Sequence, residues 1–157
     1  MIYLFAVLIG VVAGLRALMA PTIVSWVATR GTLDLSGHWL AFLGYRWTPW
    51  LLSIAALGEL VNDKLPATPS RKVPPQFAVR IVSGALSGAA IAAPSANWIA
   101  GAVCGVAGAV VGTLGGARAR GALAGAFGRD LPAALVEDAI AIVCGLASVV
   151  AASCAAA

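Results

Sequence analysis

Long apolar runs and short polar connections alternate along the chain. The apolar runs lie at about residues 2–28, 47–64, 79–96, 99–117 and 131–154. A helix needs about 20 apolar residues to cross the hydrocarbon core of a bilayer, so each run predicts one transmembrane helix. The pattern therefore predicts an all-α integral membrane protein with about five transmembrane helices, in a single polytopic domain over residues 1–157.

Two residues interrupt the first run, Arg16 and Pro21. A proline inside a helix removes a hydrogen bond and bends the helix, so we expect a kink at Pro21. The run has no basic segment before it and no small-residue cleavage site, which favours a retained span over a removable signal. After the second run, a proline-rich turn ends the helix, because proline cannot continue it.

Composition limits the class of protein. Hydrophobic residues make up 61% of the chain and charged residues 10%, and the mean hydropathy is +0.97. These values exclude a soluble catalytic domain. The cysteines are predicted to act as small hydrophobic residues, because Cys104, Cys144 and Cys154 lie in apolar stretches without the spacing of metal ligands. No cofactor is expected, and metal binding stays open.

The basic residues are divided unevenly between the connections. In a five-span arrangement, the N-terminus shares one side with the connections at 64–80 and 118–130, and the opposite side holds only Arg30 and Arg46. Basic connections stay in the cytoplasm, so the sequence predicts a bacterial inner-membrane protein with a cytoplasmic N-terminus and a periplasmic C-terminus. The same rule explains the net charge of +4, and no nucleic-acid partner is expected. The basic residues of the first side are Lys64, Arg71, Lys72, Arg80, Arg118, Arg120 and Arg129.

Aromatic and small residues add two further patterns. All five tryptophans fall near the predicted outer boundary of the membrane, where indole rings prefer the interface. In the fourth run, glycines recur every three or four residues from Gly101 to Gly116, which places them on one helix face. Such a face allows another helix to approach closely. It predicts a packing seam, and with five short helices it favours a homodimer.

Two motifs occur twice. Residues 10–17 and 112–119 both read G-x-x-x-G-x-R-A, and LVND at 60–63 corresponds to LVED at 135–138. Three predicted spans separate the starts of the two copies, so the copies would have opposite orientations across the membrane. This arrangement predicts an inverted repeat of two helices around a central helix, as found in transporters.

Ionisable residues lie inside the predicted spans. A charged side chain at mid-membrane costs roughly 2.5–3.5 kcal/mol, so it normally faces the protein interior, a partner or water. Glu59 and Asp63 are four residues apart and share a helix face. We expect one intramembrane site for an ion or solute, formed by Glu59, Asp63, Glu137, Asp138, Arg16 and Arg118. We expect its cytoplasmic mouth to be formed by Lys64, Ser70, Arg71 and Arg80.

Three functions fit these residues. In the first, the carboxylates bind a cation or exchange protons, and a small ion or polar solute crosses the bilayer. In the second, the charges form buried ion pairs, Arg16 with an acid of the second or fifth span and Arg80 with Glu59 or Asp63, in a structural or assembly subunit.

The third function is that of a metal-dependent lipid enzyme with Mg²⁺ on the acids. No nucleophile stands beside them, and the only histidine, His38, lies in the predicted outer loop. We therefore predict a transporter or channel-like protein and no enzymatic activity.

Several motifs together resemble the bacterial membrane proteins grouped as domain of unknown function 4126. They are GLRALMAPTIVSW, LAFLG, GELVNDKLPATPSRKVPP, RIVSGALSGAA and LVEDAIAI. The resemblance covers nearly the whole chain, and ELVNDKLPATPSR is its most specific part. It implies a small polytopic inner-membrane protein and brings no established activity with it.

Overall fold

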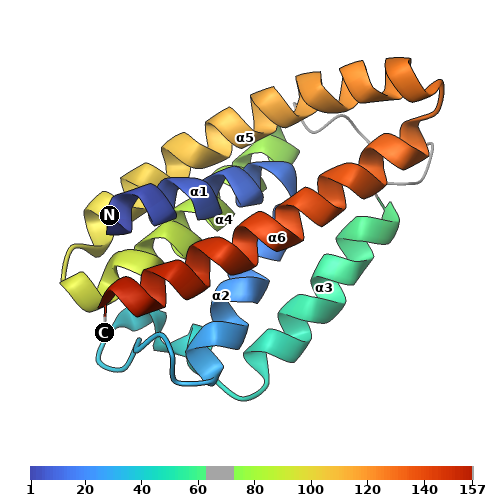
Figure 1. Cartoon of the computed structure of the whole chain (residues 1–157). Coiled ribbons are helices and arrows are strands. Elements are labelled where there is room, and N and C mark those ends of the chain that lie inside the picture. Colours follow the sequence, from blue (N-terminus) through green and yellow to red (C-terminus); the bar gives the residue numbers. More distant parts are fainter. Residues whose placement is uncertain (63–72, 157) are drawn as a thin grey trace.

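The computed structural model describes residues 1–62 and 73–156, and every regular element in these ranges is a helix, which confirms the all-α prediction (Figure 1). The α-helices are α1 (Ile2–Leu15), α2 (Met19–Thr29), α3 (Thr48–Asn62), α4 (Pro74–Ala92), α5 (Trp98–Phe127) and α6 (Asp130–Ala156). Two short 3-10 helices, η1 (Trp39–Gly44) and η2 (Ala93–Ser95), lie in the connections.

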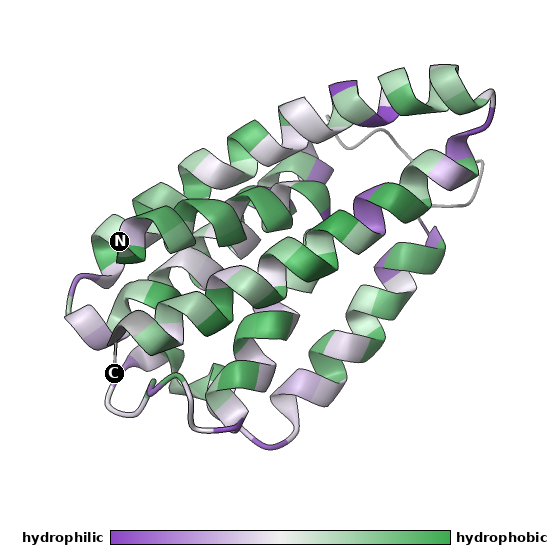
Figure 2. Cartoon of the chain, viewed as in Figure 1, coloured by the Kyte–Doolittle hydropathy of each residue, from purple (hydrophilic) through white to green (hydrophobic). Residues whose placement is uncertain are grey.

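The outer surface of the bundle is apolar. Within the described residues, three helical segments are long and apolar enough to cross a membrane, Pro74–Ser95, Trp98–Phe127 and Asp130–Cys154. Large apolar side chains such as Ile54 and Val143 are about two-thirds exposed, at 67% and 65%. Hydrophobic residues cover the ribbons along their length, and polar ones gather mainly at the connections (Figure 2). These features indicate a membrane-embedded protein.

The first apolar run forms two helices rather than one. The α1 helix ends at Leu15 because Arg16 is extended, with φ −139° and ψ 108°, and α2 begins at Met19. The prediction of a continuous span over 2–28 with a kink at Pro21 is therefore wrong. Pro21 lies in the first turn of α2, where its missing N–H breaks no bond within the helix.

The two helices form a hairpin that turns back inside the bundle. The α1 helix runs parallel to α5, because Gly10 packs against Gly105 and Gly14 against Gly112. The α2 helix runs antiparallel to α3, with Trp26 beside Trp50 near one end and Leu18 beside Glu59 at the other. The α1 helix therefore enters the bundle from one end, and α2 returns toward that end (Figure 1).

We name the two ends of the bundle by their residues. The aromatic end holds residues 30–47 and 93–97, where the ring of Trp26 lies 5.0 Å from that of Trp50 and the ring of Trp39 lies 5.8 Å from that of Trp98. The basic end holds the start of α4 and the turn between α5 and α6.

Both ends of the chain lie at the aromatic end (Figure 1). The Tyr3 hydroxyl accepts a hydrogen bond of 3.0 Å from the Asn97 amide, so α1 starts beside the turn between α4 and α5. The sequence pattern placed the N-terminus beside the connections at 64–80 and 118–130 and opposite the C-terminus, whereas both chain ends lie at the aromatic end of the bundle. The physical reason is that the α1–α2 hairpin enters and leaves the bundle at one end instead of crossing it. The side of the membrane on which each end lies stays a prediction.

The helix directions also contradict the inverted repeat. The first copy starts on α1 and the second on α5, and these two helices run parallel rather than opposite. The chain breaks at Arg16 in the first copy, whereas α5 continues through the matching Arg118 to Phe127. The connection expected at 118–130 is thus mainly helix, and it ends at Gly128, whose φ of +65° suits glycine.

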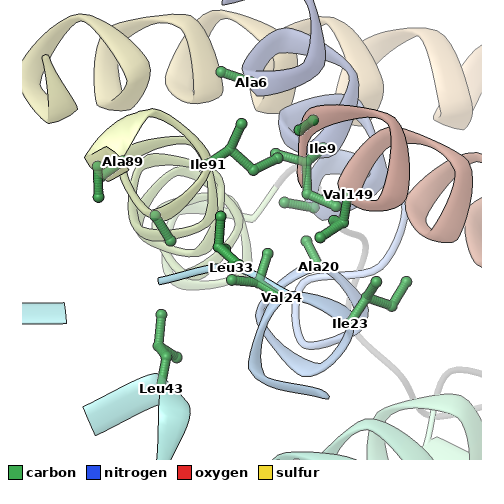
Figure 3. Packing of buried hydrophobic residues seen from close by; sticks show 14 of the residues in the cluster. Ala6, Ile9, Ala20, Ile23, Val24, Leu33, Leu43, Ala89, Ile91 and Val149 are labelled. Atoms are coloured by element: carbon green, nitrogen blue, oxygen red, sulfur yellow. The ribbon is translucent and has the colours of Figure 1, made fainter. Parts of the chain in front are cut away.

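Glycines on α5 confirm the predicted packing seam. A Cβ atom at Gly105 would overlap the Gly84 carbonyl of α4, and one at Gly112 would overlap the Val11 carbonyl of α1. The seam therefore joins α5 to two helices of the same chain, and the homodimer that it suggested stays a prediction. Beside it, Ile9, Ile91 and Val149 pack with Val24 and Leu33 in the apolar core (Figure 3).

Candidate functional site

The break between α1 and α2 lies inside the bundle and leaves peptide groups without partners in their own helices. The last carbonyls of a helix and its first N–H groups have no such partners. In a bilayer these groups must be satisfied by protein or by enclosed water, because lipid offers no hydrogen bonds. The residues that satisfy them come from α3 and α4.

Arg80 of α4 binds the carbonyl end of α1. Its Nη1 atom donates hydrogen bonds of 2.8 Å to the carbonyl oxygens of both Gly14 and Leu15. Ser83, one turn further along α4, donates to the Ala17 carbonyl. A guanidinium suits this position because the carbonyl end of a helix carries partial negative charge. Arg80 is only 2% exposed, so its guanidinium lies against the helix break, and its predicted place at a cytoplasmic mouth stays a prediction.

Glu59 of α3 binds the amide end of α2. Its two carboxylate oxygens accept hydrogen bonds from the backbone N–H groups of Ala17, at 2.9 Å, and Leu18, at 2.8 Å. The positive end of the α2 dipole favours this carboxylate. Nη2 of Arg80 lies 3.7 Å from Oε1 of Glu59, which confirms the expected pairing of these two residues.

Arg16 of the break pairs with Asp138 of α6. The Nε and Nη2 atoms of Arg16 both lie 2.6 Å from Oδ1 of Asp138, and the guanidinium is 1% exposed. The sequence predicted that Arg16 pairs with an acid of the second or fifth span, and the structure shows the partner from the fifth span. Two arginines and two carboxylates thus surround the break, and their formal charges cancel.

Arg120 is a site residue that the sequence did not reveal. It forms a bidentate pair with Asp130, at 2.9 and 2.6 Å, and its Nη1 lies 3.6 Å from the Glu137 carboxylate. Arg118, which was expected to balance the charge, is exposed on α5, and no ion pair joins it to an acid of the described ranges. The sequence signal that could have identified Arg120 is its distance along the chain from Asp130. The two residues lie on either side of the turn between α5 and α6, which brings them opposite each other.

The remaining predicted residues fall into two groups. Asp63, Lys64, Ser70 and Arg71 lie outside the described residues. His38 precedes η1 at the aromatic end, away from the acids of the site. Within residues 1–62 and 73–156, no group of three or more His, Cys, Asp or Glu side chains is placed to hold a metal ion.

Two pockets adjoin the site. The first has a volume of about 330 Å³ and reaches Glu59, and its lining includes Ala17, Leu18 and Gln76. The second has a volume of about 380 Å³, lies between α2, α3 and α4, and is lined almost wholly by apolar side chains. Glu59 is therefore the charged group of the site that a small molecule in these pockets would meet, and its side chain is 18% exposed.

In comparisons with protein-family models, curated proteins and solved structures, no match to this chain was found. The resemblance to the domain of unknown function 4126 proteins stays a prediction. Function is therefore inferred from the geometry of the broken helix and its charged partners.

Proposed function

We propose that the protein moves a small ion or polar solute across the membrane at the break between α1 and α2. The observation that carries this proposal is the pair of helix ends inside the bundle, each bound by a side chain of opposite charge, with one of these side chains facing a pocket. Discontinuous helices whose ends bind charged groups near the bilayer midplane form the binding sites of many secondary transporters.

In the proposed mechanism the two charge pairs have different roles. Glu59 faces the first pocket, so it binds the transported cation or exchanges a proton for it. Arg80 offsets the Glu59 charge and holds α1 while the site is empty. Asp138 holds Arg16, and therefore the break itself, in place.

We further propose that the basic end faces the cytoplasm of a bacterial inner membrane. Within residues 1–62 and 73–156, the arginines that lie outside the central site, apart from Arg30 and Arg46, belong to the α5–α6 hairpin. Basic segments are retained on the cytoplasmic side. In this orientation α3, α4, α5 and α6 cross the membrane, α1 and α2 re-enter it, and both chain ends are periplasmic.

Reporter fusions test this orientation. Alkaline phosphatase fused after Ala156 or before Met1 is expected to be active in both positions, because this enzyme folds only outside the cytoplasm. The same enzyme inserted after Gly128 is expected to be inactive. Activity at Gly128, or at only one chain end, would contradict the proposed arrangement.

Flux through reconstituted liposomes tests the transport proposal. With Na⁺ or K⁺ gradients imposed and a pH-sensitive dye enclosed, the wild-type protein is expected to move protons or cations. Glu59→Gln is expected to reduce this flux at least tenfold, because an amide keeps the shape of the side chain and loses its charge.

Asp34→Asn is the matched control for this substitution. Asp34 lies in the aromatic-end connection, where hydrogen bonds from the Ser36 hydroxyl and the Ser36 backbone N–H lower the pKa of its carboxyl group. This variant removes an exposed charge and is expected to keep full flux. If the wild-type protein gives no flux with any of these ions, the transport proposal fails.

The completeness of the buried ion pairs favours a second function, that of a structural or assembly subunit. A buried pair can fix helix register, and both arginines at the break are engaged by carboxylates. A Glu59→Gln variant that loses its helical circular dichroism in detergent, together with a wild type that gives no flux, would favour this function.

A further inference from the structure

The pocket that reaches Glu59 and the apolar pocket beside it are together called the groove. Leu18 and Val79 line both pockets, so the two are adjacent. Each volume lies within the range of small-molecule sites, about 300–1,000 Å³. The groove is therefore large enough for an organic molecule rather than for an inorganic ion alone.

The groove opens sideways toward the membrane. The α3 helix packs on α2 and η1, and across residues 48–62 and 74–92 there is no extensive packing between α3 and α4. Val79 and Val82 of α4, which line the groove, are 51% and 66% exposed on the apolar outer surface. A ligand dissolved in the lipid can therefore enter between α3 and α4 without passing through water.

Within the described residues, the charge that lines the groove has one sign. Of the residues in 1–62 and 73–156 that line the two pockets, only Glu59 is ionisable, and it lines the first pocket. Arg80 does not line either pocket, and its Nη1 is directed at the carbonyl oxygens of α1. Of the described residues, those that a molecule in the groove meets are thus mainly apolar, together with one carboxylate.

We infer that the ligand of this site is an amphiphilic organic cation. Its apolar body lies against Phe42, Leu52 and Leu86, and its positively charged head lies against the carboxylate of Glu59. This inference rests on the proposed function and names the class of ion that is moved. Desolvation strengthens the attraction between the cation and the carboxylate, because the groove walls have a low dielectric constant.

Binding to the purified protein in detergent tests this inference. In isothermal titration calorimetry, tetraphenylphosphonium is expected to bind the wild-type protein and to bind Glu59→Gln at least tenfold more weakly. Tetramethylammonium, which has the charge without the apolar body, is expected to bind at least tenfold more weakly than tetraphenylphosphonium. Triphenylphosphine oxide, which has similar rings and no net charge, is expected to bind as weakly as tetramethylammonium does.

A pair of tryptophan substitutions on α3 locates the ligand. Leu52→Trp fills the apolar part of the groove and is expected to weaken tetraphenylphosphonium binding at least tenfold. Leu57→Trp is the matched control, because Leu57 is 60% exposed and lines neither pocket. This variant is expected to bind as the wild type does.

The outcomes separate this inference from the proposed function. Equal binding of the neutral and cationic probes would identify an apolar cleft for lipid chains and would overturn the inference. Tighter binding of tetraphenylborate than of tetraphenylphosphonium, or no binding of tetraphenylphosphonium, would also overturn it. If inorganic cations still cross liposomes in that case, the proposed function stands. If tetraphenylphosphonium binds at Glu59 and no ion crosses, the site stands and the transport proposal fails.

Discussion

Asp138→Ala is expected to lower the free energy of unfolding by about 3–5 kcal/mol, the usual cost of removing one partner of a buried ion pair. The substitution leaves the Arg16 guanidinium, which is 1% exposed, without the carboxylate that lies 2.6 Å from it. Because Arg16 forms the break, the loss also loosens the junction of α1 and α2. Unfolding by sodium dodecyl sulfate in mixed micelles, followed by circular dichroism, measures the change.

Asp130→Ala is the matched control on the same helix. Asp130 also pairs with an arginine at 2.6 Å, but its side chain is 61% exposed. Exposed pairs contribute only about 0–1 kcal/mol, so this variant is expected to unfold nearly as the wild type does. A double variant, Arg16→Met with Asp138→Leu, is expected to recover much of the loss, because it removes both charges together. Equal losses for Asp138→Ala and Asp130→Ala would show that the buried pair does not hold the break.

Gly105→Ala is expected to destabilise the bundle by about 1–3 kcal/mol, the usual cost of overpacking a core. The new Cβ atom would overlap the Gly84 carbonyl, which is backbone and cannot rotate away, so α4 and α5 must separate. The separation also weakens the support of Arg80 and Ser83, which α4 brings to the break. Thermal unfolding in detergent measures the change.

Gly115→Ala makes the same change on the same helix at an open position. No atom lies within 4 Å of a Cβ placed at Gly115. Alanine favours a helix over glycine by about 0.5–1 kcal/mol, so this variant is expected to be as stable as the wild type or slightly more stable. If both variants lose the same stability, the close approach of α4 and α5 is not what the glycine provides.

The pattern of residues predicted much of what depends on local physical chemistry. Apolar runs located α3, α4, α5 and α6, because hydropathy is a property of one segment at a time. The predicted bounds of α4 and α5 differ from the structure, since α4 begins at Pro74 and α5 continues to Phe127. The glycine spacing on α5 predicted its packing face because small residues repeat with the helix period. Pairing of Arg16 with an acid of the second or fifth span was predictable because a buried charge needs a partner, and the structure shows that the partner is Asp138.

The break at Arg16 was not predictable from its neighbours. The residues from Arg16 to Leu18 are good helix formers, and the proline nearby lies inside the first turn of α2. The extended backbone is stable because Glu59 and Arg80 accept and donate the hydrogen bonds of the peptide groups that have no partner in their own helices. Both residues are more than forty positions away along the chain. The unexpected position of the N-terminus in the bundle has the same origin, because a run of this length fits one span or two half-helices equally well.

The sequence by itself determined that this is a helical, strongly apolar protein with charges that must be buried together, because composition and helix periodicity are sufficient for those conclusions. Only the tertiary structure decided that the first run turns back on itself, that Arg80 lies at the centre of the site, and that Arg120 rather than Arg118 meets the acids of α6. These features depend on which distant helix supplies each hydrogen bond and charge, and packing in three dimensions alone determines that choice.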